Sequence, residues 1–537
     1  MKKLRFLALF LLLTVVVSTA FAQDAATTVT TAFKEAQPNT LDPAAAQNTD
    51  EFFVLRNVCD GLVTYDPKTL APAPDLATSW DISSDGKVYT FHLRDGVTFT
   101  DGSAFDADAV KYTLDRLAQA STGTSYTAGL VLGSVVGWSD VRPAVTKVGD
   151  GTPTPTAPPP VTSISGVKVV DAKTVEITLT KALPSFLESL TLPGGYIVAK
   201  GDSDFTNGPV CTGAYKITEF TPQQQLVLDA NDKYWGGAPA VKHVVIKVIP
   251  QQSEAELEYE AGNLDLVNVA PTDIQRLQGD ATLSKQLVKV PLLSTFLLRI
   301  NLHDDVMKNP AVRKALASAI DRQTIIDTVL QGQGVPAEGL FPPGLSAYSA
   351  DFQPFVYDPT AIKKSLADAG YPDGVTITVV TAQVETENAV LNAITQTAAP
   401  AGITFKVNSV EASVATQTRN DCTMQAGSVS WGFDYPDAEN IATQVLAGSV
   451  KSRINCGYGD YENVDQVQAL YNQAVVAPLG ADRDKLWQQY QDLAVGQEVA
   501  VIPIYFPTSN SLVNPRLGGM PIDNQGNTQF KLITLGS

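Results

Sequence analysis

Between residues 88 and 93 every second residue is a large hydrophobic one, in the run VYTFHL. This period of two predicts a strand with one buried face. Residues 97–100 predict a second short strand, and the Asp95-Gly96 turn between them predicts a hairpin. The pattern indicates a piece of sheet inside a larger domain.

Helical spacing follows this stretch and recurs along the chain. Asp106 is a suitable N-cap for a helix with leucines and valines on one face. A second helix is predicted to begin near residues 49–50, and a third at Pro310, after the cap Asn309. Near the C terminus a strand is predicted over Val499–Phe506. Periodicity alone supports no more than small pieces of helix and strand within larger domains.

The N-terminal residues have the features of a secretory signal peptide. Three cations precede an apolar run from Phe6 to Val17, and Ala20-Phe21-Ala22 fits a cleavage site before Gln23. A membrane anchor is the alternative, but a spanning helix needs about 20 apolar residues. Lipid-anchored proteins carry a cysteine after the cleavage site, whereas Gln23 stands here. We therefore expect an exported protein that is not a lipoprotein.

Length and charge limit the possible partners. The 537 residues, of which 44% are hydrophobic, are enough for two or three domains. Removing the three signal-peptide cations leaves 35 cations against 56 acids, a formal charge of −21. Nucleic acids and anionic membranes need a basic surface, so neither is expected as a partner. A cationic or zwitterionic ligand would fit the charge, although solubility alone also explains it.

No catalytic or metal-binding motif is visible. The chain has three histidines, far apart in sequence, and lacks the usual hydrolase, phosphate-loop and zinc patterns. A pair of carboxylates of the glycosidase type leaves no sequence signature, so hydrolysis remains an alternative. The four cysteines of an exported protein suggest two disulfides, with three possible connectivities, or free buried cysteines.

Long ordered segments resemble one protein family. "LATSW", "DGKVYTFHLRDGVTFTDG" and "ADAVKYTLDR" occur in that order within residues 76–116, and "NPAVRKALASAIDR" occupies residues 309–322. Together they resemble the bacterial extracellular solute-binding proteins of the oligopeptide, dipeptide and nickel type (family 5). These are the substrate-binding components of ABC importers.

The resemblance implies a periplasmic-binding-protein-like α/β fold of type II, cluster C. Two main lobes would enclose a ligand cleft, and a third domain would be added to them. The expected division is a signal peptide at 1–22, domain I at 23–65, 200–297 and 501–537, domain II at 66–199 with a Pro/Thr-rich loop at 149–163, and domain III at 298–500.

The resemblance also suggests ligand-binding residues. Residues 430–437, "SWGFDYPD", resemble a cleft-wall segment in which peptide-binding members hold the ligand's α-ammonium with an aspartate, which corresponds to Asp434. A turn or cap role for Asp434, and core packing for Trp431, are the alternatives. Some oligopeptide receptors have an arginine six residues before this aspartate, whereas Ser428 stands here. The full set of expected ligand-binding residues is Asp434, Trp431, Tyr435, Phe433, Asn48 and Arg419.

The family layout ranks two disulfides first, Cys59 with Cys211 and Cys422 with Cys456, because each pair would then lie within one lobe. A disulfide between moving lobes would oppose their motion.

The function implied is that of a periplasmic protein that captures short peptides by hinge closure and delivers them to an ABC permease in the inner membrane. We expect a monomer without catalytic residues, metal or cofactor. The alternatives are a non-peptide solute such as a nickel complex or an oligosaccharide, an exported hydrolase on the same scaffold, or a receptor subunit that signals to a membrane sensor.

Overall fold

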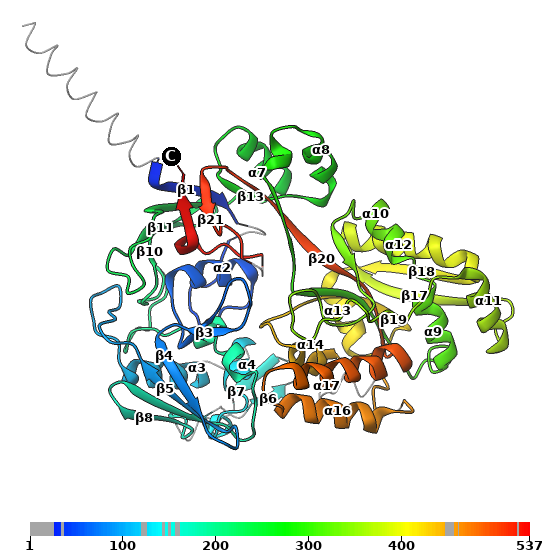
Figure 1. Ribbon diagram of the computed structural model, residues 1–537, viewed down its shortest axis with the longest axis horizontal. Coiled ribbons are helices and arrows are strands. Elements are labelled where there is room, and N and C mark those ends of the chain that lie inside the picture. Colours follow the sequence, from blue (N-terminus) through cyan, green and yellow to red (C-terminus); the bar gives the residue numbers. More distant parts are fainter. Residues whose placement is uncertain are drawn as a thin grey trace, which may run out of the picture.

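The structure of the protein, a computed structural model, shows two lobes side by side (Figure 1). One continuous sheet runs through both lobes. The predicted signal peptide, residues 1–22, lies outside the described residues. The structure describes residues 26–33, 37–119, 126–141, 145–148, 152–155, 162–445, 456–459, 461–523 and 526–536.

Twelve strands form the main sheet. One side, ordered β10-β11-β12-β1-β13, builds domain I, and the other, ordered β15-β19-β17-β18, builds domain III, with β20 between them. β14 and β16 also pair with β20. The bounds are β1 Thr28–Ala32, β10 Tyr215–Thr221, β11 Gln225–Ala230, β12 His243–Lys247, β13 Leu266–Asn268, β14 Leu287–Pro291, β15 Ser294–Ile300, β16 Gly334–Pro336, β17 Val375–Ala382, β18 Ile403–Val410, β19 Ala426–Gly432 and β20 Val501–Val513.

β20 belongs to both lobes. Its residues 501–505 pair with β15 of domain III, and its residues 511–513 pair with β13 of domain I. With 13 residues it extends over about 40 Å. The strand predicted over Val499–Phe506 is its first half. The second half, PTSNSLV, is more polar and begins with a proline, so hydrophobic periodicity did not predict it.

Domain II is built on a separate four-stranded sheet ordered β4-β5-β9-β8. The predicted strand at residues 88–93 is β5, and its alternate residues are buried. The predicted hairpin with residues 97–100 is wrong, because β5 pairs with β4 and β9 instead. Only an isolated bridge forms at Thr98. The bounds are β4 Ala77–Ile82, β5 Val88–Leu93, β8 Val167–Asp171 and β9 Thr174–Thr178.

Helices cover the sheets of all three domains. The helices predicted from the caps at residues 48–50, Asp106 and Asn309 are α2, α3 and α9. The bounds are α2 Thr49–Val58, α3 Ala107–Gln119, α4 Tyr126–Leu132, α5 Trp138–Val141, α6 Phe186–Ser189, α7 Gln252–Glu260, α8 Ile274–Gly279, α9 Pro310–Ser318, α10 Arg322–Thr328, α11 Pro359–Asp368, α12 Glu385–Ala398, α13 Ala412–Asn420, α14 Ala438–Val445, α16 Val464–Val476 and α17 Ala481–Gln491.

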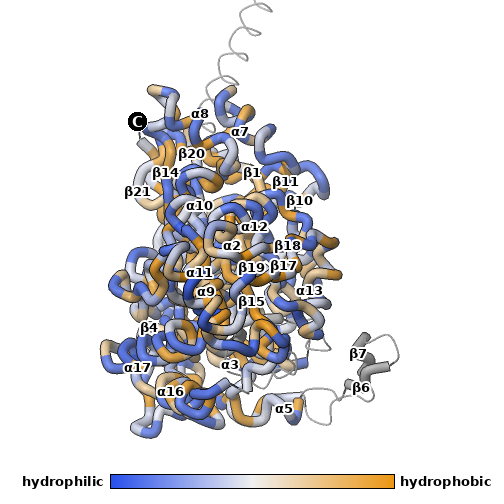
Figure 2. Tube along the Cα trace, turned by 90° about the vertical axis from the view of Figure 1, so that its right-hand side faces the viewer, coloured by the Kyte–Doolittle hydropathy of each residue, from blue (hydrophilic) through white to orange (hydrophobic). Residues whose placement is uncertain are grey.

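The buried hydrophobic residues form four clusters. One fills domain III, one fills domain II, and two lie on either side of the domain I sheet. Figure 2 shows hydrophobic positions gathered along the central strands and hydrophilic positions along the outer turns. Separate cores are what a chain of this length needs, because single cores stop growing beyond about 250–300 residues.

The domain boundaries expected from the sequence remain predictions. Most of the expected Pro/Thr loop at 149–163 lies outside the described residues, but Thr152–Pro155 form β7 and pair with β6, Val145–Val148. Two further strand pairs complete the structure: β2 Val63–Tyr65 with β3 Pro72–Pro74, and β21 Leu517–Gly519 with β22 Ile533–Leu535.

The start of α2 is fixed by one buried carboxylate. Glu51 accepts hydrogen bonds from the backbone N–H groups of Asn39, Thr40, Gln47 and Asn48, at 2.6–3.3 Å. Asn48 in turn caps the helix by accepting from the Glu51 N–H at 3.0 Å. This capping box therefore holds the whole loop before α2 against the helix.

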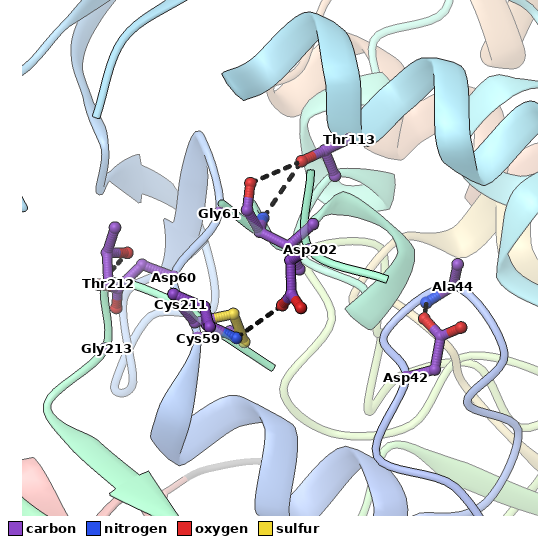
Figure 3. Close-up of a disulfide and its surroundings, with 12 residues drawn as sticks. Asp42, Ala44, Cys59, Asp60, Gly61, Thr113, Asp202, Cys211, Thr212 and Gly213 are labelled. Atoms are coloured by element: carbon purple, nitrogen blue, oxygen red, sulfur yellow. Dashed lines mark hydrogen bonds between the residues drawn. A yellow bond between two sulfur atoms is a disulfide. The ribbon is translucent and has the colours of Figure 1, made fainter. Parts of the chain in front are cut away.

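The structure contains two disulfides. Cys59 is joined to Cys211 within domain I, and Cys422 is joined to Cys456 within domain III. Figure 3 shows Asp60 and Thr212 beside the first of them, where the Thr212 hydroxyl donates to Asp60 Oδ2 at 3.0 Å. Neither disulfide crosses between the lobes.

Replacing Glu51 is expected to loosen the loop before α2. Glu51→Ala removes the acceptor of four backbone N–H groups and should lower the free energy of unfolding by about 1.5–3 kcal/mol. Hydrogen exchange of residues 37–49 should rise in this variant. The exposed Glu254→Ala is the matched control and should change neither quantity. Unchanged exchange in Glu51→Ala would contradict this account of the loop.

Opening the second disulfide is expected to destabilise domain III. The Cys422→Ser, Cys456→Ser double variant frees a loop with a sequence separation of 34 and should lose about 2–4 kcal/mol of unfolding free energy. The corresponding Cys59, Cys211 variant frees a separation of 152 and should lose more. Thermal unfolding without reductant measures both. Equal stability of the domain III variant and the wild type would refute the expectation.

Candidate functional site: the cleft between domains I and III

A cavity of about 680 Å³ lies between domain I and domain III. Four segments line it: the start of α2, the link from β14 to β15, the end of β19, and a loop near the C terminus. Because these segments come from both lobes, a ligand in the cavity would contact both. The lining residues are Gln47, Asn48, Thr49, Phe52, Arg56, Leu292, Leu293, Ser294, Ser430, Gly432, Phe433, Asp434 and Asn527.

Domain I presents one face of α2 to the cavity. Asn48, Phe52 and Arg56 are four residues apart, and residues at this spacing lie on the same side of a helix. Arg56 Nη1 donates to the Tyr65 hydroxyl at 2.5 Å and lies 4.0 Å from Asp523 Oδ2. A guanidinium stays charged at any relevant pH. This side of the cavity therefore offers a charged guanidinium, which Asp523 partly balances.

Domain III presents the end of β19 and the turn after it. The Phe433 N–H donates to the Leu293 carbonyl at 2.9 Å, and the Ser294 hydroxyl donates to the Trp431 carbonyl at 2.9 Å. These two bonds hold the end of β19 to the segment that links the lobes. The domain III wall is therefore built directly on the lobe junction.

Asp434 is held in place by an amide. Asn440 Nδ2 donates to Asp434 Oδ2 at 2.9 Å, and Asn440 Oδ1 accepts from Trp431 Nε1 at 3.1 Å. Trp431 packs against the domain III core and does not line the cavity. Its indole instead orients Asn440, which orients the carboxylate of Asp434.

The expected ligand-binding residues are only partly brought together. Asp434, Phe433 and Asn48 line the cavity. Tyr435 is buried against the domain II core, and its hydroxyl donates to Glu439 Oε2 at 2.5 Å. The chain bends at residues 434–436, and the neighbour of Tyr435, Asp434, lines the cavity.

Arg419 also lies outside the cavity lining. Its Nη1 donates to the Ser428 carbonyl at 3.0 Å, close to the Cys422–Cys456 disulfide. Ser428 itself is buried and donates to Glu387 Oε2 at 3.0 Å. The position where some relatives place an arginine is thus part of an internal polar network of domain III.

Sequence reasoning missed ten of the thirteen lining residues, among them Arg56, Gln47 and Asn527. Arg56 had a detectable signal, because it lies two helical turns after Asn48, which was already expected to bind ligand. Gln47 and Asn527 come from loops, where no periodicity indicates which side chains face a cavity.

In the described part of the chain, no group of three or more His, Cys, Asp or Glu residues could hold a metal ion. Within the same ranges, no helix combines the length and the apolar character that crossing a membrane requires.

Comparison with known proteins matches residues 71–452 to the family model "Bacterial extracellular solute-binding proteins, family 5 Middle". Heme-binding protein A of Haemophilus influenzae is 28% identical over 491 residues, covering 86% of this chain and 84% of that protein. The periplasmic oligopeptide-binding protein OppA of Escherichia coli is 26% identical over 536 residues, covering 94% of each.

The solved structure of the murein tripeptide binding protein MppA, in its unliganded open form, superposes with a TM-score of 0.80. The two sequences are 24% identical, and the match covers 95% of this chain and 97% of that one. The match confirms the predicted α/β fold with two lobes of the type II arrangement. The resemblance seen in the sequence is also confirmed: the chain belongs to family 5 of the bacterial extracellular solute-binding proteins.

Proposed function

We propose that this protein is the periplasmic substrate-binding component of an ABC importer and captures short peptides in the cleft between domains I and III. The observation that supports this most is the pair of opposite charges in one cavity, Arg56 from domain I and Asp434 from domain III. A peptide with free ends carries a positive ammonium, which would pair with Asp434, and a negative carboxylate, which would pair with Arg56. We propose binding without catalysis, followed by delivery to a permease in the inner membrane.

The two charged ends of a peptide would be bound by different groups. A carboxylate such as that of Asp434 makes charge-assisted hydrogen bonds with an ammonium, and a guanidinium holds a carboxylate through a planar fork of donors. The cavity of about 680 Å³ is in the usual range for small-molecule sites and has room for a few residues of peptide.

Backbone pairing would add affinity that does not depend on side chains. β19 pairs with β17 only at Ala426 and Gly427, and no strand among the described residues pairs with the far edge of residues 430–432. An extended peptide could add itself there as a strand. We propose that this edge forms hydrogen bonds with the peptide backbone, while Arg56 and Asp434 bind the charged ends of the peptide.

Capture is proposed to work by hinge closure. The ligand would contact both lobes, so it would bind the closed form more tightly and shift the equilibrium towards it. The junction, formed by β20 and the link at Leu292 and Leu293, would absorb the motion. A dissociation constant of about a micromolar, or about −8 kcal/mol, would suit capture followed by release.

A non-peptide solute is the second candidate, because a heme-binding protein is among the relatives. Iron in a heme is usually held by histidine, cysteine, methionine or tyrosine. None of the lining residues in the described part of the chain is of these types. This composition favours the peptide proposal over heme.

Native mass spectrometry of protein purified from the periplasm without denaturation tests the ligand class. A series of short peptides would support the proposal, and a single non-peptide species would overturn the peptide part of it. Turnover of the peptides by the purified protein would instead favour an exported hydrolase.

Removing the charge of Asp434 is expected to weaken peptide binding. Asp434→Asn should raise the dissociation constant of trialanine about 10- to 100-fold, since a charged hydrogen bond contributes about 1.5–3 kcal/mol. N-acetyl-trialanine should bind the wild type with a similar loss. Calorimetry measures both. Asp421→Asn, an exposed acid of the same domain, is the control and should bind normally.

The carboxylate end should depend on Arg56. Trialanine amide should bind the wild type about 10- to 100-fold more weakly than trialanine, by the same reasoning. Arg56→Gln should lose the preference for the free acid over the amide. Circular dichroism would check the variant's fold, because Arg56 also contacts Tyr65. Equal affinity of the wild type for acid and amide would exclude Arg56 as the carboxylate site.

A further inference from the structure

Four charged residues are buried together where domain II meets domain III. Glu188 comes from α6 of domain II, whereas Asp437, Glu439 and Arg483 come from domain III. Their exposed fractions are 5%, 4%, 8% and 3%. Among the described residues, three carboxylates therefore share one guanidinium in a region almost closed to solvent. Buried charge without compensation is strongly unfavourable, so this composition requires a further positive charge or a proton.

The Arg483 guanidinium forms an ion pair with one of the three carboxylates, that of Asp437. Arg483 Nη1 and Nη2 donate to the two oxygens of Asp437 at 2.5 and 2.9 Å, and its Nε donates to the Ala474 carbonyl at 2.9 Å. This is the bidentate geometry of a strong ion pair. Arg483 and Asp437 thus balance each other, which leaves two carboxylates.

Glu439 is stabilised by hydroxyl groups. Its Oε2 accepts from the Tyr435 hydroxyl at 2.5 Å and from the Ser185 hydroxyl at 3.4 Å. Ser185 belongs to domain II, so this second bond crosses the domain interface. Tyr435 lies in the domain II core although it comes from the domain III chain. Two donors make Glu439 the better site for a negative charge.

Glu188 is left as the carboxyl that holds a proton. Its Oε2 is buried and has no hydrogen-bond partner among the described residues. Burial and the neighbouring charge of Asp437 raise the pKa of Glu188 to about 8. Glu439 acts in the same direction, whereas Arg483 opposes it. Tyr89 of β5 is the other titratable group that faces it, and burial and Glu188 raise the pKa of Tyr89 to about 12.

The cluster is directly connected to the cleft wall. The binding segment, residues 433–440, contains the cavity residue Asp434 at one end and Asn440, which holds the Asp434 carboxylate, at the other. Between them lie the residues fixed to domain II. Any loosening of the interface would therefore displace both Asp434 and its support.

We propose that Glu188, Asp437, Glu439 and Arg483 form a proton-dependent latch that fastens the binding segment to domain II. Domain II would then position the binding segment, and this role goes beyond ligand capture itself. Only the consequence for peptide affinity rests on the function proposed above.

The direction of the pH effect follows from the raised pKa of Glu188. In the unfolded chain a glutamate titrates near 4.5, whereas here it titrates near 8. The contribution of this group to stability is therefore complete below about pH 4.5 and declines as the pH rises to about 8. Above that pH, an ionised Glu188 repels Asp437 and Glu439, and the binding segment loosens.

Hydrogen exchange of the binding segment tests the latch without any ligand. Wild type and Glu188→Gln are compared at about pH 4 and at pH 9, since intrinsic exchange rates cancel at equal pH. The neutral glutamine keeps the latch closed at both values. At pH 9 the wild-type segment should exchange about threefold faster or more than the variant, and at about pH 4, where Glu188 holds its proton in both the closed and the open segment, the two should agree. Glu188→Asp should restore the pH dependence.

Glu256→Gln is the matched control. Burial raises the pKa of Glu256 to about 7, but it lies on α7 of domain I, away from the interface. This variant should alter the pH dependence of global stability and leave the exchange of residues 433–440 as in the wild type. Equal exchange in wild type and Glu188→Gln at pH 9, or the same change in both variants, would overturn the latch.

Trialanine affinity links the latch to the proposed function. The peptide's own ammonium titrates near pH 8, so variants are compared with the wild type at the same pH. Glu188→Gln should bind trialanine about threefold more tightly than the wild type at pH 9 and equally at about pH 4. If trialanine binds neither protein, the peptide proposal fails, and the exchange experiment still decides on the latch.

Discussion

One strand, β20, is hydrogen-bonded to strands of both lobes, and this limits how the lobes can move relative to each other. Its first residues pair with β15 and its last with β13. The lobes are therefore not tethered by loose linkers. Relative motion has to be absorbed within a strand and in the link at Leu292 and Leu293, by changes in twist and backbone angles. The cavity lies beside this junction, and both linking residues line it.

The placement of charges fits this constraint. On the proposed mechanism, a ligand that meets only Arg56 or only Asp434 would gain the contacts of one lobe and would have no preference between open and closed forms. A ligand with both charges would gain its full contacts only when the lobes approach, and its differential affinity would then drive closure. Domain II would take part through the interface at Tyr435, which is buried in the domain II core beside Asp434.

Local signals in the sequence predicted several elements correctly but not their partners. β5, α2 and α9 were predicted because periodicity and caps lie within a few residues of each other. The strand predicted to pair with β5, residues 97–100, was the wrong one. β4 precedes β5 and pairs with it, and a turn signal after a strand does not exclude a partner before it. Three of the six expected ligand residues line the cavity, whereas Trp431, Tyr435 and Arg419 do not, because side-chain direction depends on contacts with distant segments.

The capping of α2 has an electrostatic consequence for the cleft. A helix N terminus normally presents a partial positive charge that attracts anions. Here Asp50 and Glu51 lie in the first turn, and the Glu51 carboxylate occupies the backbone N–H groups of the preceding loop. The macrodipole of α2 is thus largely neutralised at the cavity. The attraction of this wall for an anionic group would then depend on one side chain, Arg56, whose charge is partly offset by Asp523 at 4.0 Å.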